Sequence, residues 1–233
     1  FIVLAAFIAG SFAGSLHLSW WEGLPGMAAV ALGERMGAAG VALQLAVIAV
    51  AAWALRRHPI PRGALGLLGG SWPILGGAAA LAVLNAATLA VAGQPWGITW
   101  AFALWGAKLA RTVGWDPAGS SWADGSMRTA LDASLVADVT SVMDFGLMAG
   151  AALAAALAGR FAPRLAISAR SAAAAVLGGL AMGYGARLAY GCNVGAFFSG
   201  VASTSLHGWV WIAAALPGCW VGIRLRPAFG LAN

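Results

Sequence analysis

The stretch Tyr184–Gly208, YGARLAYGCNVGAFFSGVASTSLHG, decides the fold because it interrupts an otherwise apolar sequence. It follows the small-residue run Ala172–Gly183 and precedes a second apolar run, Trp209–Ile223. It is rich in glycine and hydroxyl side chains, holds a cysteine at its middle and contains no acidic residue. Backbone with unpaired N–H and C=O groups cannot face lipid, so this break predicts chain that is buried in protein or lines a polar cavity. In membrane proteins such breaks mark binding or conduction sites.

The composition indicates a membrane protein. Hydrophobic residues make up 61% of the chain and charged residues only 9%, and the mean hydropathy is +0.86. A soluble domain carries roughly a quarter charged residues, so this chain cannot cover a water-facing surface. The 33 glycines suit closely packed or broken membrane helices. The net charge of +6 comes mainly from short loops, which favours membrane topology and lipid headgroups over nucleic acid as its explanation.

Apolar runs predict a single transmembrane domain over residues 1–233, since a span needs roughly 20 apolar residues. All spans are expected to be helical, because an open sheet cannot sit in lipid and no alternating barrel pattern appears. The chain begins at Phe1 inside an apolar run, which indicates a fragment that starts within a membrane helix rather than a signal peptide. The predicted spans are Ile2–Leu18, Gly37–Leu55, Trp72–Ala92, Leu135–Leu157, Ala172–Tyr190 and Trp209–Ile223.

Arginine clusters predict the topology, because basic loops stay in the cytoplasm. The loop Arg111–Ser134 carries aspartates and is then periplasmic. For the loops to lie on these sides, two segments, near 93–110 and 191–206, must enter and leave the membrane on the same side. We therefore predict that both are re-entrant. The clusters assigned to the cytoplasm are Arg56–Gly63, Arg160–Ser171 and the tail from Arg224.

The two re-entrant segments look like copies of each other. Gly93–Gly97 and Gly191–Gly195 share G-x-x-x-G, each after a long small-residue helix and before aromatic and small residues. Alone, this motif more often marks helix dimerisation. At matching places after matching helices it predicts an internal repeat, the usual plan of secondary transporters. The residues expected to line a substrate pathway are Gly93, Gln94, Gly97, Thr99, Gly191, Cys192, Asn193, Gly195 and Ser199.

Cys192 is the candidate contact for a substrate. If Asn193–Ser205 begins a half-helix near mid-membrane, its free N–H groups and positive dipole end suit an anion. A buried cysteine is commonly a small hydrophobe, but the position of Cys192 between the glycines of a break favours function. A neutral thiol is a weak donor and a soft partner, which suits a sulfur-bearing anion that binds briefly. Cys219 is interpreted as structural, on a packing face with neighbouring glycines, and no metal or cofactor motif appears.

Charged residues in or near the spans leave alternatives open. Asp138 and Asp144 are candidates for proton coupling or for pairing with Lys108 or Arg187. Asp138 lies early in its predicted helix, where an acid complements the helix dipole. Arg187 is either an interfacial side chain that reaches toward headgroups or an attractor for anions.

With those residues in view, the chain resembles the YeeE/YedE family of bacterial sulfur transporters, or thiosulfate permeases. The resemblance implies an all-helical, inverted-repeat protein of the inner membrane with short re-entrant helices that meet at its middle. Cys192 matches the family's later Gly-Cys position and Cys219 matches none. The family's earlier Gly-Cys motif is absent, so the chain corresponds to the later part of a longer protein. The motifs are GYGARLAYGCNVGAFFSGVASTSLHGWVW, GQPWGITWAFALWGAKL and ADVTSVMDFG.

The resulting hypothesis is a permease, not an enzyme, that takes up thiosulfate or a similar sulfur anion past Cys192. The resemblance also implies a cytoplasmic sulfur-carrier protein of the TusA or rhodanese type as a partner, and the arginines of the tail predict a cytoplasmic C-terminus. The rival hypothesis is a membrane thiol oxidoreductase that passes electrons or sulfane sulfur through Cys192. Such an enzyme needs a second thiol within disulfide reach, and Cys219 is the only other cysteine in this sequence. A third alternative is a structural subunit of a larger complex.

Overall fold

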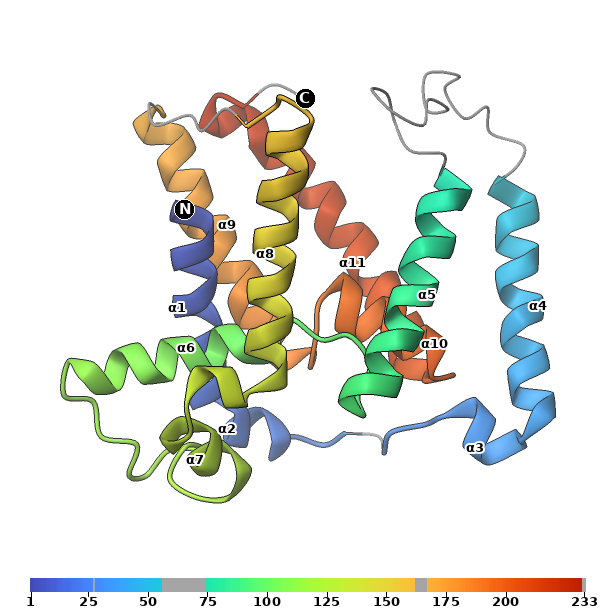
Figure 1. The fold of residues 1–233 in the computed structure, drawn as a ribbon, viewed down its shortest axis with the longest axis horizontal. Helices are drawn as coiled ribbons and strands as arrows, with labels where there is room; N and C mark the ends of the chain where they lie inside the picture. The colour runs from blue at the N-terminus through green and yellow to red at the C-terminus, as the bar shows by residue number, and fades with distance from the viewer. Residues whose placement is uncertain (27, 56–73, 162–166, 232–233) are drawn as a thin grey trace.

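The computed structural model describes residues 1–26, 28–55, 74–161 and 167–231, and its regular elements there are all helices (Figure 1). An isolated β-bridge joins Ala31 and Ser205. The longer helices are α1 (Ile2–Leu16), α4 (Ala38–Leu55), α5 (Ile74–Ala92), α6 (Thr99–Thr112), α8 (Val139–Leu157), α9 (Ala169–Leu188) and α11 (Leu206–Leu225). The shorter ones are α2 (Leu18–Glu22), α3 (Leu32–Met36), α7 (Gly125–Asp132), η2 (Leu135–Ala137), η3 (Asn193–Ser199), α10 (Gly200–Ala202) and η4 (Arg226–Phe229).

Each predicted span corresponds to one of the long helices. Among the described residues, α8 and the stretch Leu206–Phe229 are long and apolar enough to cross a membrane alone. Helix α9 passes the same test together with Asn193–Ala202, from which it is bent by 40°. The apolar parts of α1, α4 and α5 are shorter. The span predicted from Leu135 begins instead at Val139, because the carboxylate of Asp138 accepts a hydrogen bond from the Ser141 amide and caps α8.

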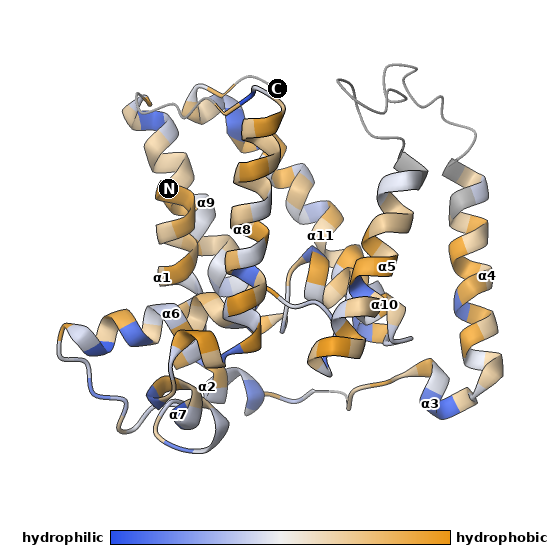
Figure 2. Ribbon diagram, viewed as in Figure 1, coloured by the Kyte–Doolittle hydropathy of each residue, from blue (hydrophilic) through white to orange (hydrophobic). Residues whose placement is uncertain are grey.

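Several helices are apolar on most of their surface, as Figure 2 shows for α4, α5 and α8. Large side chains such as Leu45 and Val91 are exposed, the second to 90%. A soluble helix keeps a polar face toward water, whereas a helix that is hydrophobic all round is buried or spans a membrane. The polar Gln44 of α4 is an exception. It lies buried and bonds to the Val201 carbonyl and the Trp209 indole.

Glycines allow α1 and α9 to pack closely side by side (Figure 1). A Cβ atom at Gly10 would lie 2.3 Å from the Leu180 carbonyl oxygen, and one at Gly183 would lie 2.2 Å from the Phe7 carbonyl oxygen. The Ser11 hydroxyl bonds to the carbonyl of Gly183 at 3.2 Å. Small residues in a membrane helix pair bring the two backbones together in this way.

Helix α6 lies crosswise to α8 and provides the buried core of its end of the molecule (Figure 1). Trp122, in the loop before α7, is completely buried against Leu104 and Leu131 and donates a hydrogen bond to the Ser15 hydroxyl at 2.8 Å. The loop is also held by ion pairs of Asp132 with Arg111 and Arg128. Hydrogen bonds from these arginines hold the pKa of Asp132 below its usual value.

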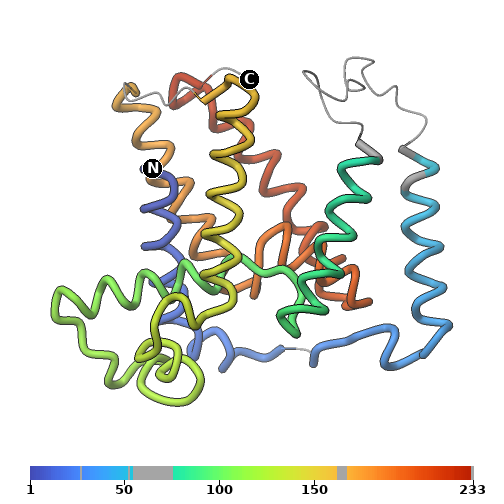
Figure 3. The backbone as a smooth tube through the Cα atoms, in the orientation of Figure 1, coloured from blue at the N-terminus to red at the C-terminus, as the bar shows by residue number. Residues whose placement is uncertain are grey.

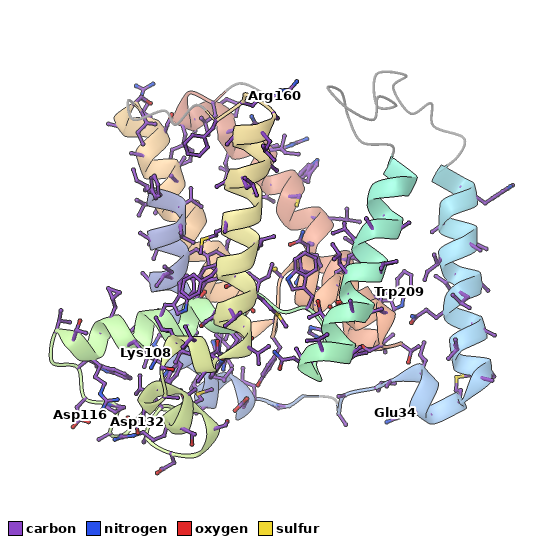
Figure 4. The ribbon with its side chains drawn as sticks, in the orientation of Figure 1. Glu34, Lys108, Asp116, Asp132, Arg160 and Trp209 are labelled. Atoms are coloured by element: carbon purple, nitrogen blue, oxygen red, sulfur yellow. The ribbon has the colours of Figure 1, made fainter. Side chains whose placement is uncertain are left out.

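The charged loops lie at two opposite ends. Arg160 lies at one end (Figure 4), together with η4 after α11 (red in Figure 1), and Asp116, Asp132 and Glu34 lie at the other (Figure 4). Of the arginine clusters expected to share one side, Arg56–Gly63 lies outside the described residues. Figure 3 shows that the chain turns back after α5 before it enters α6.

Candidate functional site

The backbone after α9 breaks at Tyr190 and Gly191. Tyr190 has a φ of +50° and Gly191 a φ of +158°. A Cβ atom at Gly191 would lie 2.5 Å from the Ala196 amide nitrogen, so only glycine fits there. After Cys192, the seven residues Asn193–Ser199 form the π-helix η3. This geometry is rare and frequently occurs at functional sites.

The half-helix predicted over Asn193–Ser205 is not a single helix. It consists of η3 and the three-residue α10, and it ends at Thr204, whose φ is +60°. The chain around the start of α3 pairs with the residues that follow α10. The Leu32 amide donates a hydrogen bond to the Thr204 carbonyl at 2.9 Å, and the Leu206 amide donates one to the Val30 carbonyl at 2.9 Å. The helical part of the segment runs over Asn193–Ala202, because α10 follows η3 directly.

The two broken segments touch each other. The hydroxyl of Ser199, which is buried in η3, donates a hydrogen bond to the carbonyl of Trp96 at 3.0 Å. The Trp96 amide in turn donates to the Asn85 side-chain oxygen of α5 at 3.0 Å. Sequence analysis did not select Asn85, although an amide inside an apolar span is the kind of signal that could have found it.

The first break, between α5 and α6, depends on Gly93, whose φ of +71° favours glycine. Gln94 lies 3.5 Å from the Thr140 hydroxyl of α8. Gly97 has open space around it, and Thr99 is buried as the first residue of α6.

Cys192 precedes η3 as a half-buried free thiol. Its carbonyl accepts a hydrogen bond from the Ala196 amide at 2.8 Å, and its thiol bonds to none of the described residues. Asn193 beside it is exposed. At Gly195 the nearest neighbour of an added Cβ would be the Tyr190 carbonyl at 4.0 Å. A side chain at Gly195 would therefore meet no close neighbour, in contrast to one at Gly191.

The second cysteine does not join this site. Cys219 is a free thiol exposed on α11. The rival oxidoreductase hypothesis required a partner thiol for Cys192, and in this structure the two cysteines are not bonded to each other.

The expected pairing of intramembrane acids with Lys108 or Arg187 is not found among the described residues. Lys108 instead donates to the carbonyls of Leu131 and Ala133, at 2.8 and 2.5 Å, and thereby fastens the chain after α7. Asp138 caps α8 and accepts the Trp100 indole N–H at 2.9 Å, which agrees with its dipole-related interpretation.

Asp144 and Arg187 are buried ionisable side chains that form no ion pair with the described residues. Asp144 is 1% exposed, and both of its carboxylate oxygens lack a hydrogen-bond partner. Arg187 is 7% exposed, and its Nε lacks one as well. Burying an ionisable side chain without a partner costs free energy. Such a residue in a membrane segment is therefore a candidate for a functional role.

Comparison with known proteins matches residues 1–221 to the family described as sulphur transport. The chain belongs to the sulphur transport family. This confirms the resemblance read from its motifs, and with the apolar helices it identifies an all-α, multi-pass membrane protein.

Curated relatives of this sulphur transport family member are transporters. "Probable transporter YedE" of Escherichia coli is 31% identical over 165 residues, which cover 68% of this chain and 39% of that protein. "Thiosulfate transporter TsuA" of Spirochaeta thermophila is 39% identical over 75 residues, which cover 32% of this chain and 23% of that protein. The chain thus spans about two fifths of the length of the first relative. No solved structure matches it significantly.

Proposed function

We propose that the protein takes up thiosulfate or a related sulfur-containing anion across the bacterial inner membrane. The observation that carries this proposal is the free, half-buried thiol of Cys192 at a backbone break that only glycine at position 191 can form. The relative named as a thiosulfate transporter supports the substrate class.

Cys192 makes a soft, transient contact in this proposal. A neutral thiol offers a weak S–H donor and a polarizable sulfur, so it can hold the terminal sulfur of thiosulfate without trapping the anion. The residues Gly93–Gly97 and Gly191–Gly195 line the path in two re-entrant segments. The bond from Ser199 to the Trp96 carbonyl supports this, because it brings the two breaks into contact.

Uptake of labelled thiosulfate into vesicles by the full-length protein, with neither reductant nor quinone, tests the proposal. We expect Cys192→Ala to abolish or strongly reduce uptake while the protein still folds, and Cys192→Ser to fall between. Cys219→Ala is the matched control and retains uptake, because that thiol is exposed on α11. Uptake at the wild-type rate by Cys192→Ala contradicts the relay. Loss in both single variants, with a disulfide on oxidation, favours the oxidoreductase.

We also propose that Asp144 couples uptake to protons. Entry of an anion against a negative interior potential costs about 2.3 kcal/mol per charge per 100 mV, so accumulation needs co-transported cations. Asp144 lies within α8, and neither oxygen of its carboxyl group has a hydrogen-bond partner among the described residues. The variant Asp144→Asn is expected to lose accumulation driven by an inward proton gradient and to keep thiosulfate counterflow. Asp116→Asn in the exposed loop is the control. Gradient-driven uptake at the wild-type rate in Asp144→Asn rules out this role.

The partner at the cytoplasmic side is, in this proposal, a sulfur-carrier protein of the TusA or rhodanese type, which accepts sulfur from the imported anion. The substrate class supports it. Crosslinking of the purified carrier to the end of the molecule that bears Arg160 and η4 tests this partner, and absence of any crosslink there while the protein transports thiosulfate contradicts it.

A further inference from the structure

Arg187 is a buried cation that forms neither an ion pair nor a hydrogen bond with the described residues, although the charge of Glu22 attracts it. Its side chain is 7% exposed near the C-terminal end of α9, and its Nε has no hydrogen-bond partner. Ion pairs among the described residues are made by Asp132, which bonds to Arg111 and Arg128 in the exposed loop. A cation removed from water needs an opposite charge or hydrogen bonds to offset its lost hydration.

Two aromatic faces hold the guanidinium in place. Its central carbon lies 5.3 Å from the centre of the Trp100 ring and 5.8 Å from the centre of the Tyr190 ring. Ring faces attract a cation at such distances. A contact with ring faces uses none of the N–H donors of the guanidinium, and these donors bond to none of the described residues.

Two carboxylates accept hydrogen bonds from the side chains that carry these rings, and neither forms an ion pair with Arg187. Asp138 accepts the indole N–H of Trp100 at 2.9 Å and the amide of Ser141 at 2.7 Å. Glu22 accepts the hydroxyl of Tyr190. Each acid therefore fixes the position of a ring and is itself already hydrogen-bonded. The two rings beside the guanidinium are thus held in position, while the guanidinium itself forms no ion pair with the described residues.

The location of this cluster connects it with the break. Tyr190 is the residue whose positive φ begins the break, and the Gly191 amide bonds back to the carbonyl of Ala186, next to Arg187, at 2.9 Å. Trp100 belongs to the first turns of α6, which follow the other break. Residues from both broken segments thus form the cluster.

We propose that Arg187 is the oxyanion subsite of the transport pathway, where the planar fork of its N–H groups holds the oxygens of the substrate. The proposal rests on the proposed function and deepens it. A guanidinium binds two oxygens of one anion through parallel hydrogen bonds, which a point charge cannot do. A thiosulfate-like anion carries oxygens at one end and sulfur at the other, so Arg187 recognises the first and Cys192 the second.

Uptake kinetics of the full-length protein in vesicles test this subsite. We expect Arg187→Gln to raise the KM for thiosulfate by about tenfold or more, since bonds to a charged donor are the strong ones, with a much smaller effect on kcat. Arg187→Lys keeps the charge and loses the fork, so its KM should lie between. The matched control is Arg224→Gln, because Arg224 also stacks on an aromatic ring, 3.9 Å from the centre of Trp220, but is exposed on α11.

A binding measurement separates this inference from the transport proposal. Thiosulfate should raise the melting temperature of the purified wild-type protein and of Cys192→Ala, but not that of Arg187→Gln. A wild-type KM in Arg187→Gln overturns the subsite, and if that variant does not fold, a wild-type KM in Arg187→Lys does so. Lack of uptake by the wild-type protein instead refutes the proposed function, whatever the effect at Arg187.

Discussion

At the scale of single residues, the two glycines of the second break have different roles. A side chain at Gly191 meets the backbone of Ala196, whereas one at Gly195 meets open space. We expect Gly191→Ala to lower expression and melting temperature, because the backbone itself would have to move. Gly195→Ala should fold normally, and Gly195→Leu should fold but slow uptake, since the side chain enters the proposed pathway. Melting temperatures and uptake rates check both. Normal uptake by a folded Gly195→Leu shows that Gly195 does not face the pathway.

Single residues also show where sequence reasoning reaches its limit. The sequence selected Cys192, Asp144 and Arg187 by residue type and position, and the structure shows the last two as buried and unpaired. It did not select Trp100 or Tyr190 as partners of Arg187. Aromatic residues in a membrane protein are common anchors, and only the packing of α6 against α9 reveals which ring faces a cation.

At the scale of elements, the contact of α1 with α9 depends on glycine at particular positions. We predict that Gly183→Leu lowers the melting temperature sharply, because the Cβ position lies 2.2 Å from the Phe7 carbonyl oxygen and overpacking costs about 1–3 kcal/mol or more. Gly178→Leu is the control on the same helix, since nothing lies within 4 Å of its Cβ position. Equal melting temperatures for the two variants, measured in detergent, contradict this view of the packing.

The sequence predicted which segments form long helices better than it predicted the residues at which these helices begin and end. The apolar runs located the long helices because transfer of a side chain into lipid depends on its own chemistry. The start of α8 moved to Val139 because a cap decides it, and beyond α10 the chain turns at Thr204, whose carbonyl accepts the amide of Leu32 at the start of α3. Such contacts join residues that lie far apart in the chain, and a local pattern does not contain them.

At the scale of the whole molecule, we predict that the end bearing Arg160 and η4 faces the cytoplasm. The structure separates Arg160 from Asp116 (Figure 4), and arginine-rich loops remain inside. An impermeant maleimide applied from the periplasm should label Asp116→Cys and not Arg160→Cys, with the reverse result in inverted vesicles. Labelling of both positions from one side contradicts this topology.

The sequence by itself determined the membrane class, the long helices, the position of the break and the family, because hydropathy, glycine content and motif are properties of local residues. Tertiary structure alone decided that Ser199 meets the Trp96 carbonyl and that Arg187 lies over the rings of Trp100 and Tyr190 without forming an ion pair with the described residues. These relations depend on the angles and distances at which separate helices pack. The energy of those contacts comes from pairs of distant residues, so the order of amino acids along the chain does not specify it locally.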